Sequence, residues 1–165
     1  MPNGNVVNLY NNNMVVDLEL QIATTTKTVP HPALFKTWMS VILANRLDTN
    51  AELTIRIVDE EEMIQLNARY SNKNKVTNVL SFPIHFESDL DGLDSDILGD
   101  IVICAEVVEL EAKQQNKELL SHWAHMVVHG VLHLLGFDHQ NTIEANEMET
   151  LEIDLMQQLG FPSPY

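Results

Sequence analysis

One long apolar segment, residues 117–136, constrains the fold of this chain more than any other feature. It reads KELLSHWAHMVVHGVLHLLG and has the length and the apolar content of a helix that is buried on most sides. Such a helix needs other elements around it to cover its surface. We therefore expect a domain that is built around this helix.

The other segments alternate irregularly between strand and helix patterns, which is typical of an α+β fold. We expect strands at residues 14–23, 52–59, 77–86 and 98–109, and helices at residues 31–47, 60–70, 110–116 and 142–160. Pro83 favours an edge position or the end of the third strand, because proline cannot donate a hydrogen bond to a neighbouring strand. The chain has 165 residues and no internal linker, so we expect a single domain over residues 1–165, with a loose terminus at residues 1–12.

The last of these segments predicts an amphipathic helix. Its acidic residues are expected to face outward. The apolar residues that recur at helical spacing are expected to face inward, and they are Met148, Leu151, Leu155 and Leu159.

The only cysteine, Cys104, lies in an apolar run and is expected to be a small buried residue. The acidic segment 87–96 predicts a solvated loop; a calcium loop is the alternative, although the usual ligand pattern is missing.

The charge distribution points in two directions. The net charge of −15 argues against binding to nucleic acid, because phosphate would be repelled. Residues 63–86, however, contain no acid and carry Arg69, Lys73 and Lys75. This segment is either a surface that contacts RNA or an ordinary solvated turn.

The first residues and the hydropathy of the chain bear on its location. No apolar run is long enough to span a membrane, and the N-terminus lacks the basic start and apolar stretch of a secretory signal. We therefore expect a cytoplasmic protein without a membrane partner.

Three histidines within HGVLHLLGFDH predict a metal site. His129 and His133 are four residues apart, which places their rings side by side on a helix, about 6 Å apart at Cβ. Gly136 can end the helix, so that His139 turns back to the same point. Three imidazoles that leave a fourth position open are typical of a catalytic zinc, and we expect one Zn²⁺ per chain.

Two neighbours of these histidines have open roles. His125 lies one turn earlier on the same stripe, where packing or a hydrogen bond to a metal ligand is favoured over ligation. Asp138 either orients an imidazole or caps the turn.

Gly130 indicates which reaction such a zinc would serve. Zinc peptidases with this histidine spacing carry a glutamate directly after the first histidine, which moves a proton to the leaving amine. Glycine cannot do so. A phosphodiester depends more on a cation that offsets phosphoryl charge, so metal with nearby basic residues favours RNA. Arg69 or Lys73 would then contact phosphate, and Tyr70 or Phe82 could stack on a base.

The motifs HWAHMVVHG, HGVLHLLGFDH, TNVLSFP and LGDIVIC together resemble the YbeY family of bacterial endoribonucleases, from about residue 14 to the end. The resemblance implies a small mixed β-sheet around a central metal-binding helix, with zinc on His129, His133 and His139. It implies metal-dependent cleavage of single-stranded RNA in maturation of the 16S rRNA 3′ end and in ribosome quality control. The implied partners are the 16S rRNA precursor and the ribosome or a small-subunit protein, not DNA.

One departure concerns the family's Tyr-Arg-Gly-Lys sequence before TNVLSF. Here Ser71 and Asn72 stand at the arginine and glycine positions, while Lys73 matches the lysine. Arg69 is the candidate to replace the arginine.

The competing functions are a metallopeptidase-like hydrolase, which Gly130 disfavours, and a non-catalytic ribosome-assembly factor with a structural zinc.

Overall fold

A computed structural model describes residues 15–44, 46–47, 50–84 and 95–165. Within them the elements are β1 (Val16–Ala23), α1 (Pro32–Leu43), β2 (Asn50–Val58), α2 (Glu60–Ser71), β3 (Val79–Pro83), β4 (Ser95–Cys104), α3 (Ala105–Gln114), α4 (Leu119–Leu134) and α5 (Thr142–Gln158). The predicted loose terminus and most of the acidic segment 87–96 lie outside the described residues.

The strands form one mixed sheet in the order β1-β2-β4-β3. β1 and β4 both run parallel to β2, whereas β3 runs antiparallel to β4. β3 is therefore an edge strand, and Pro83 is its last residue, as the sequence predicts. The expected α+β fold with a small mixed sheet is confirmed.

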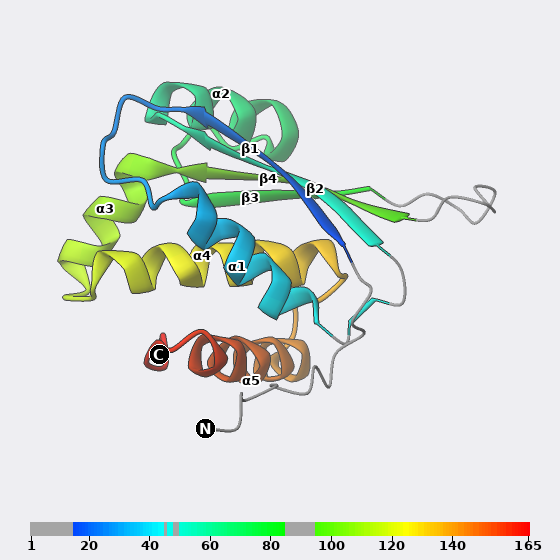
Figure 1. Cartoon of the computed structure of the whole chain (residues 1–165). Coiled ribbons are helices and arrows are strands. Elements are labelled where there is room, and N and C mark those ends of the chain that lie inside the picture. The colour runs from blue at the N-terminus through cyan, green and yellow to red at the C-terminus, as the bar shows by residue number, and fades with distance from the viewer. Residues whose placement is uncertain (1–14, 45, 48–49, 85–94) are drawn as a thin grey trace.

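Helices cover both faces of the sheet (Figure 1). α2 lies on one face, α1 and α4 lie on the other, and α5 lies beneath α4 on the side away from the sheet. The alternation of β4 serves both layers: Ile101 and Ile103 belong to the core with α4, while Val102 and Cys104 pack with Met63 of α2. Cys104 is buried, which confirms that prediction.

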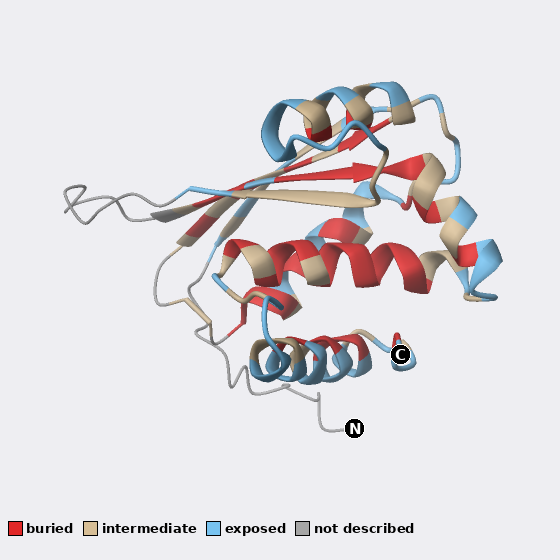
Figure 2. Cartoon of the chain, turned by 180° about the vertical axis from the view of Figure 1, so that it is seen from behind, coloured by how far each residue is buried: buried red, intermediate tan, exposed pale blue. Residues whose placement is uncertain are grey.

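α4 is the helix at the centre of the larger core, and it is buried along most of its length (Figure 2). Every residue from 121 to 128 is buried, because β3 and β4 cover one side of the helix and α1, α3 and α5 pack around the rest. Trp123 anchors the middle and packs edge-on against Phe35 of α1, with 6.2 Å between ring centroids. The long apolar segment thus organises the fold as its composition predicts.

Two predicted elements extend well beyond the ends that the structure gives them. The strand expected at 98–109 ends at Cys104, because its pairing partners end there: Cys104 pairs with the last residue of β2, and Val79 at the start of β3 pairs with Ile103. The chain continues as α3 and buries Val108 at helical spacing. The helix expected at 31–47 ends at Leu43.

The predicted pattern of α5 holds for its apolar residues and fails for one acid. Met148 and Leu155 are buried, and Leu151 and Leu159 pack against the same core. Glu152, expected to face outward with the other acids, is only 1% exposed. A carboxylate therefore points into the molecule beneath α4.

No helix in the described part of the chain combines the length and the apolar character needed to cross a membrane.

Candidate metal centre

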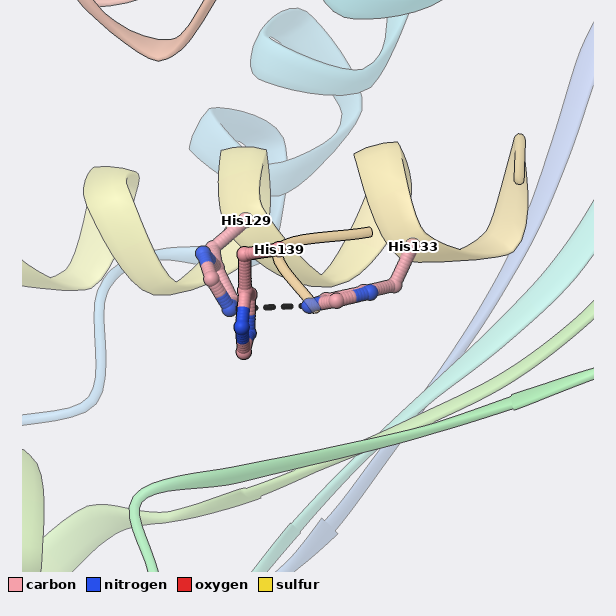
Figure 3. Close-up of side chains that lie close together, drawn as sticks. All are labelled: His129, His133 and His139. Atoms are coloured by element: carbon pink, nitrogen blue, oxygen red, sulfur yellow. Dashed lines mark hydrogen bonds between the residues drawn. The ribbon is translucent and has the colours of Figure 1, made fainter. Parts of the chain in front are cut away.

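Three histidine side chains converge at the C-terminal end of α4 (Figure 3). His129 and His133 stand one turn apart on the helix, with ring centroids 4.6 Å apart. The ring of His139 lies 5.1 Å from that of His133 and 5.7 Å from that of His129. One nitrogen from each ring lies within 4.8 Å of the other two. The structure therefore brings all three sequence-predicted ligands together.

The turn after α4 delivers His139. Gly136 has a φ of +98°, a left-handed conformation that glycine adopts easily, as the sequence predicts for the end of this helix. The amide of Gly136 donates to the carbonyl of His133, and the amide of Phe137 donates to that of Leu132, each at 3.0 Å. Asp138 accepts the backbone N–H of His139 at 2.8 Å, so it caps the turn rather than contacting an imidazole.

The donor set fits a small cation such as zinc. The Nε2 atoms of His129 and His133 are 3.1 Å apart, close to the roughly 3.3 Å that separates two nitrogens bound to one tetrahedral zinc at about 2.05 Å. Burial, together with the nearby His129 and His139, lowers the pKa of His133. A lowered pKa keeps this imidazole neutral, which is the form that ligates metal.

The histidines line one wall of an open groove of about 530 Å³. The opposite wall is residues 77–81 and Pro83, that is, edge strand β3 and the two residues before it. Among the described residues no lysine or arginine lines this groove. Positive charge at the groove would therefore come from protonated histidines or from a bound cation.

A second group of side chains lies behind the histidines. Glu152 of α5 accepts hydrogen bonds from Nδ1 of His129 at 3.2 Å, from the hydroxyl of Tyr165 at 2.9 Å, and from Nε2 of His125. Burial alone would raise the pKa of Glu152, but the hydrogen bonds from His125 and His129 outweigh it and lower the pKa to about 2. His125 thus contacts the carboxylate that holds a candidate ligand, as the sequence favours.

Glu152 is not among the site residues predicted from the sequence, although its spacing carries a signal. Glu152 is four residues after Met148 and three before Leu155, so it interrupts an inward apolar stripe with a charged residue. A charge at such a position is rarely buried unless it is paired. The partners that explain it come from a different helix and from the last residue of the chain.

Two contacts fix α4 against the sheet at the groove. The hydroxyl of Ser81 on β3 donates to the carbonyl of Gly130 at 3.1 Å. A Cβ atom on Gly130 would lie 2.9 Å from Cγ2 of Ile101, closer than such atoms pack. Gly130 therefore faces β4, and the helix approaches the sheet closely because no side chain separates them.

The structure does not bring Arg69, Tyr70 or Phe82 together with the histidines. These residues line a different groove, of about 560 Å³, between α2 and the opposite face of the sheet. The Arg69 guanidinium lies 5.3 Å from the centre of the Tyr70 ring, which in turn contacts Phe82 edge-on.

Lys73 is on the loop from α2 to β3. Its side chain is exposed and lines neither of the two grooves. Asn72 just before it has a left-handed φ of 52°. Asparagine tolerates this conformation, so the turn does not require glycine at this position. Buried Asn67 orders the loop by donating to the carbonyl of Lys75.

The chain is similar to known proteins in sequence and in fold. It matches the family model described as "Endoribonuclease YbeY" over residues 19–160. Among solved structures it is similar to the solution structure of TM1509 from Thermotoga maritima, with 24% sequence identity and a TM-score of 0.58. The similarity covers 85% of this chain and 88% of that one. At this identity the structural likeness supports the fold alone.

Proposed function

The chain belongs to the YbeY endoribonuclease family, and on this premise we propose that it is a zinc-dependent, single-strand-specific endoribonuclease. Membership of the family supports a metal-dependent endoribonuclease of rRNA processing. The finer proposal is that this chain acts in maturation of the 16S rRNA 3′ end and in ribosome quality control. The observation that carries it is the convergence of His129, His133 and His139 beside an open groove.

We assign one zinc ion per chain to these three histidines. Three imidazoles leave room for a further ligand, which distinguishes catalytic from structural zinc sites. When bound, zinc supplies a Lewis acid that polarises a phosphoryl oxygen and offsets developing negative charge. The protein holds the ligands rigidly, since two are on a buried helix and the third follows a capped turn.

The groove is suited to holding a strand of RNA beside the histidines. Its volume is within the usual range of ligand pockets, about 300–1,000 Å³, and its far wall is an edge strand rather than a covered surface. In the proposed function an unpaired strand lies along β3 in this groove, and single-strand specificity is part of that proposal.

The metallopeptidase alternative is disfavoured by the position of Gly130. A peptidase of this histidine spacing needs a glutamate there to move a proton. A side chain at residue 130 would point at Ile101 of β4, whose Cγ2 atom would lie 2.9 Å from the added Cβ. The packing of α4 on the sheet therefore disfavours a glutamate at this position.

The proposed partners are single-stranded RNA of the 16S precursor and the ribosome or a small-subunit protein, in the cytoplasm. The net charge of −15 opposes general attraction to RNA, so contact would be restricted to a small surface or aided by a protein partner. Arg69 and Lys73 stay proposals as RNA contacts. Of the two, Lys73 is on the loop that leads into the wall of the histidine groove.

An RNA cleavage assay tests the proposal. Purified chain loaded with zinc should cleave a single-stranded RNA, and chelator or His133→Ala should abolish the cleavage. His31→Asn is the matched control, because His31 is exposed and its ring only caps α1 through the amide of Ala33. Cleavage that survives chelation, or that His133→Ala leaves intact, would contradict the zinc mechanism.

The same assay separates the remaining alternative. If RNA stays intact in all samples while the chain binds ribosomal particles, the assembly-factor function is correct instead. The ends of the products identify the nucleophile, since a 2′,3′-cyclic phosphate arises only from attack by the RNA 2′-hydroxyl.

A further inference from the structure

The buried carboxylate of Glu152 needs an explanation, because burying a charge is costly unless it is paired. An ionised carboxyl group loses several kcal/mol of solvation when it is moved out of water. Glu152 is 1% exposed and stands in the apolar stripe of α5 between Met148 and Leu155. No lysine or arginine is among the hydrogen-bond or ion-pair partners that the described residues give it.

The partners of Glu152 are instead two imidazole rings and one tyrosine hydroxyl, which act as hydrogen-bond donors. One carboxylate oxygen accepts from Nδ1 of His129, and the other accepts from Nε2 of His125 and the hydroxyl of Tyr165. A carboxylate can only accept, so each of these atoms must carry the proton. The arrangement fixes the tautomer of His129 with its proton on Nδ1.

This tautomer leaves a lone pair on Nε2 of His129, the atom that faces the other histidines. That atom is 3.1 Å from Nε2 of His133. Metal-binding histidines commonly donate their second ring N–H to a carboxylate, which fixes the ring orientation and makes the ligand more basic. The geometry of Glu152 meets this requirement for one of the three candidate ligands.

We propose that Glu152 is a positioning residue, which holds His129 in the metal-binding tautomer while His125 and Tyr165 hold the carboxylate in place. The proposal rests on the proposed function, because it assumes that the three histidines bind a metal. It extends the site to α5 and to the C-terminal residue, which are far from the histidine motif in the sequence. The carboxylate acts through His129 and does not touch the metal.

A competing explanation is a second metal site. His125, His129 and Glu152 each offer one atom within 4.8 Å of the other two, so they could hold an ion themselves. We favour the positioning role because His125 and Glu152 are both buried and line no part of the histidine groove, and because Nδ1 of His129 lies at hydrogen-bond distance, 3.2 Å, from the carboxylate. Metal stoichiometry separates the two explanations.

The test compares Glu152→Gln with Glu149→Gln, a change of the same kind at an exposed position of the same helix. Zn²⁺ and Co²⁺ affinities are measured by competition with a chromophoric chelator, and the visible spectrum of the Co²⁺ form reports the ligand geometry. We expect one equivalent of metal in the unmodified chain, an affinity about 10- to 100-fold weaker in Glu152→Gln, and no change in Glu149→Gln. Tyr165→Phe should give a smaller loss, because His129 keeps its contact.

A second measurement needs no variant. Nitrogen-15 NMR of the metal-free chain assigns the tautomer of His129, which we expect to be protonated at Nδ1. Protonation at Nε2, an unchanged affinity in a folded Glu152→Gln chain, or a second equivalent of metal that Glu152→Gln removes would each overturn the proposal. None of these readouts uses RNA, so a chain that passes them yet cleaves no RNA fails only the proposed function.

Discussion

Gly130 has two consequences at the scale of a single residue. It removes the proton-transferring glutamate of a zinc peptidase, which the sequence indicates. It also lets α4 approach β4, which becomes visible only from the 2.9 Å that would separate its Cβ from Ile101. Absence of a side chain here therefore bears on both chemistry and packing.

Gly130→Ala tests the packing role. Alanine is favoured over glycine inside a helix by about 1 kcal/mol, but insertion of a methyl group into a tight core costs roughly 1–3 kcal/mol. Because Cγ2 of Ile101 is on a stiff β-branched side chain, we expect the cost to exceed the gain and the free energy of unfolding to fall by about 1 kcal/mol. Urea denaturation measures it, and an increase in stability would show that the helix has room to spare.

At the scale of elements, α4 carries a row of histidines that differ in role. His129 and His133 face the groove, and His125 contacts Glu152 from the neighbouring turn. His122, one turn before His125, is buried near Glu111 of α3, and its ring nitrogens have no hydrogen-bond partner in the described structure. Along one helix the same residue type is thus proposed to bind metal at His129 and His133 and to position Glu152 at His125, whereas His122 packs in the interior.

His122 predicts a pH dependence of stability. Burial lowers its pKa below 6.5, against the opposing attraction of Glu111 at 3.7 Å. The unfolded chain then takes up a proton near pH 6.5 while the folded chain does not, so this contribution is present above that pH and is lost as pH falls. We expect His122→Gln to lose less stability than the unmodified chain between pH 7.5 and 5.5.

Urea denaturation in the presence of chelator measures this difference without interference from metal binding. The other six histidines are common to both proteins, so the titration of those that do not interact with His122 cancels in the comparison. His125 is the neighbour with which His122 interacts, at 6.3 Å between ring centroids. Parallel curves of stability against pH would show that His122 is protonated in the folded chain, paired with Glu111.

At the scale of the whole molecule, the sheet separates two grooves. The histidine groove lies between β3 and α4, and the groove of Arg69, Tyr70 and Phe82 lies under α2 on the opposite face. The loop that carries Lys73 connects these two regions around the edge strand. A strand of RNA held at the histidines would therefore meet Lys73 before it could reach Arg69.

Charge reversal at Lys73 and at Arg69 tests whether RNA contacts Lys73 more closely than Arg69. We expect Lys73→Glu to weaken the binding of single-stranded RNA about tenfold at low salt, since it replaces an attraction to phosphate by a repulsion. Arg69→Glu should have a smaller effect. Lys113→Glu is a control at an exposed position of α3. Filter binding at two salt concentrations measures the effects, and a larger loss for Arg69→Glu would place RNA on the α2 face.

The elements and the three-histidine cluster could be predicted from the sequence because both depend on local spacing. Residues 129 and 133 share a helix face whatever surrounds them, and Gly136 ends that helix through its own backbone preference. The boundary between β4 and α3 could not be predicted from the sequence, because the apolar run continues past it. The strand ends at Cys104 because its pairing with β2 and β3 ends there.

Tertiary structure alone decided which charged groups meet. Arg69 is only a few residues from Lys73 and the TNVLSF motif, yet α2 places it on the other side of the sheet from the histidines. Glu152 and Tyr165 are distant in sequence from His129, yet the packing of α5 against α4 brings them behind its ring. Local preference is encoded in neighbouring residues, whereas burial and pairing of charges depend on how the layers pack.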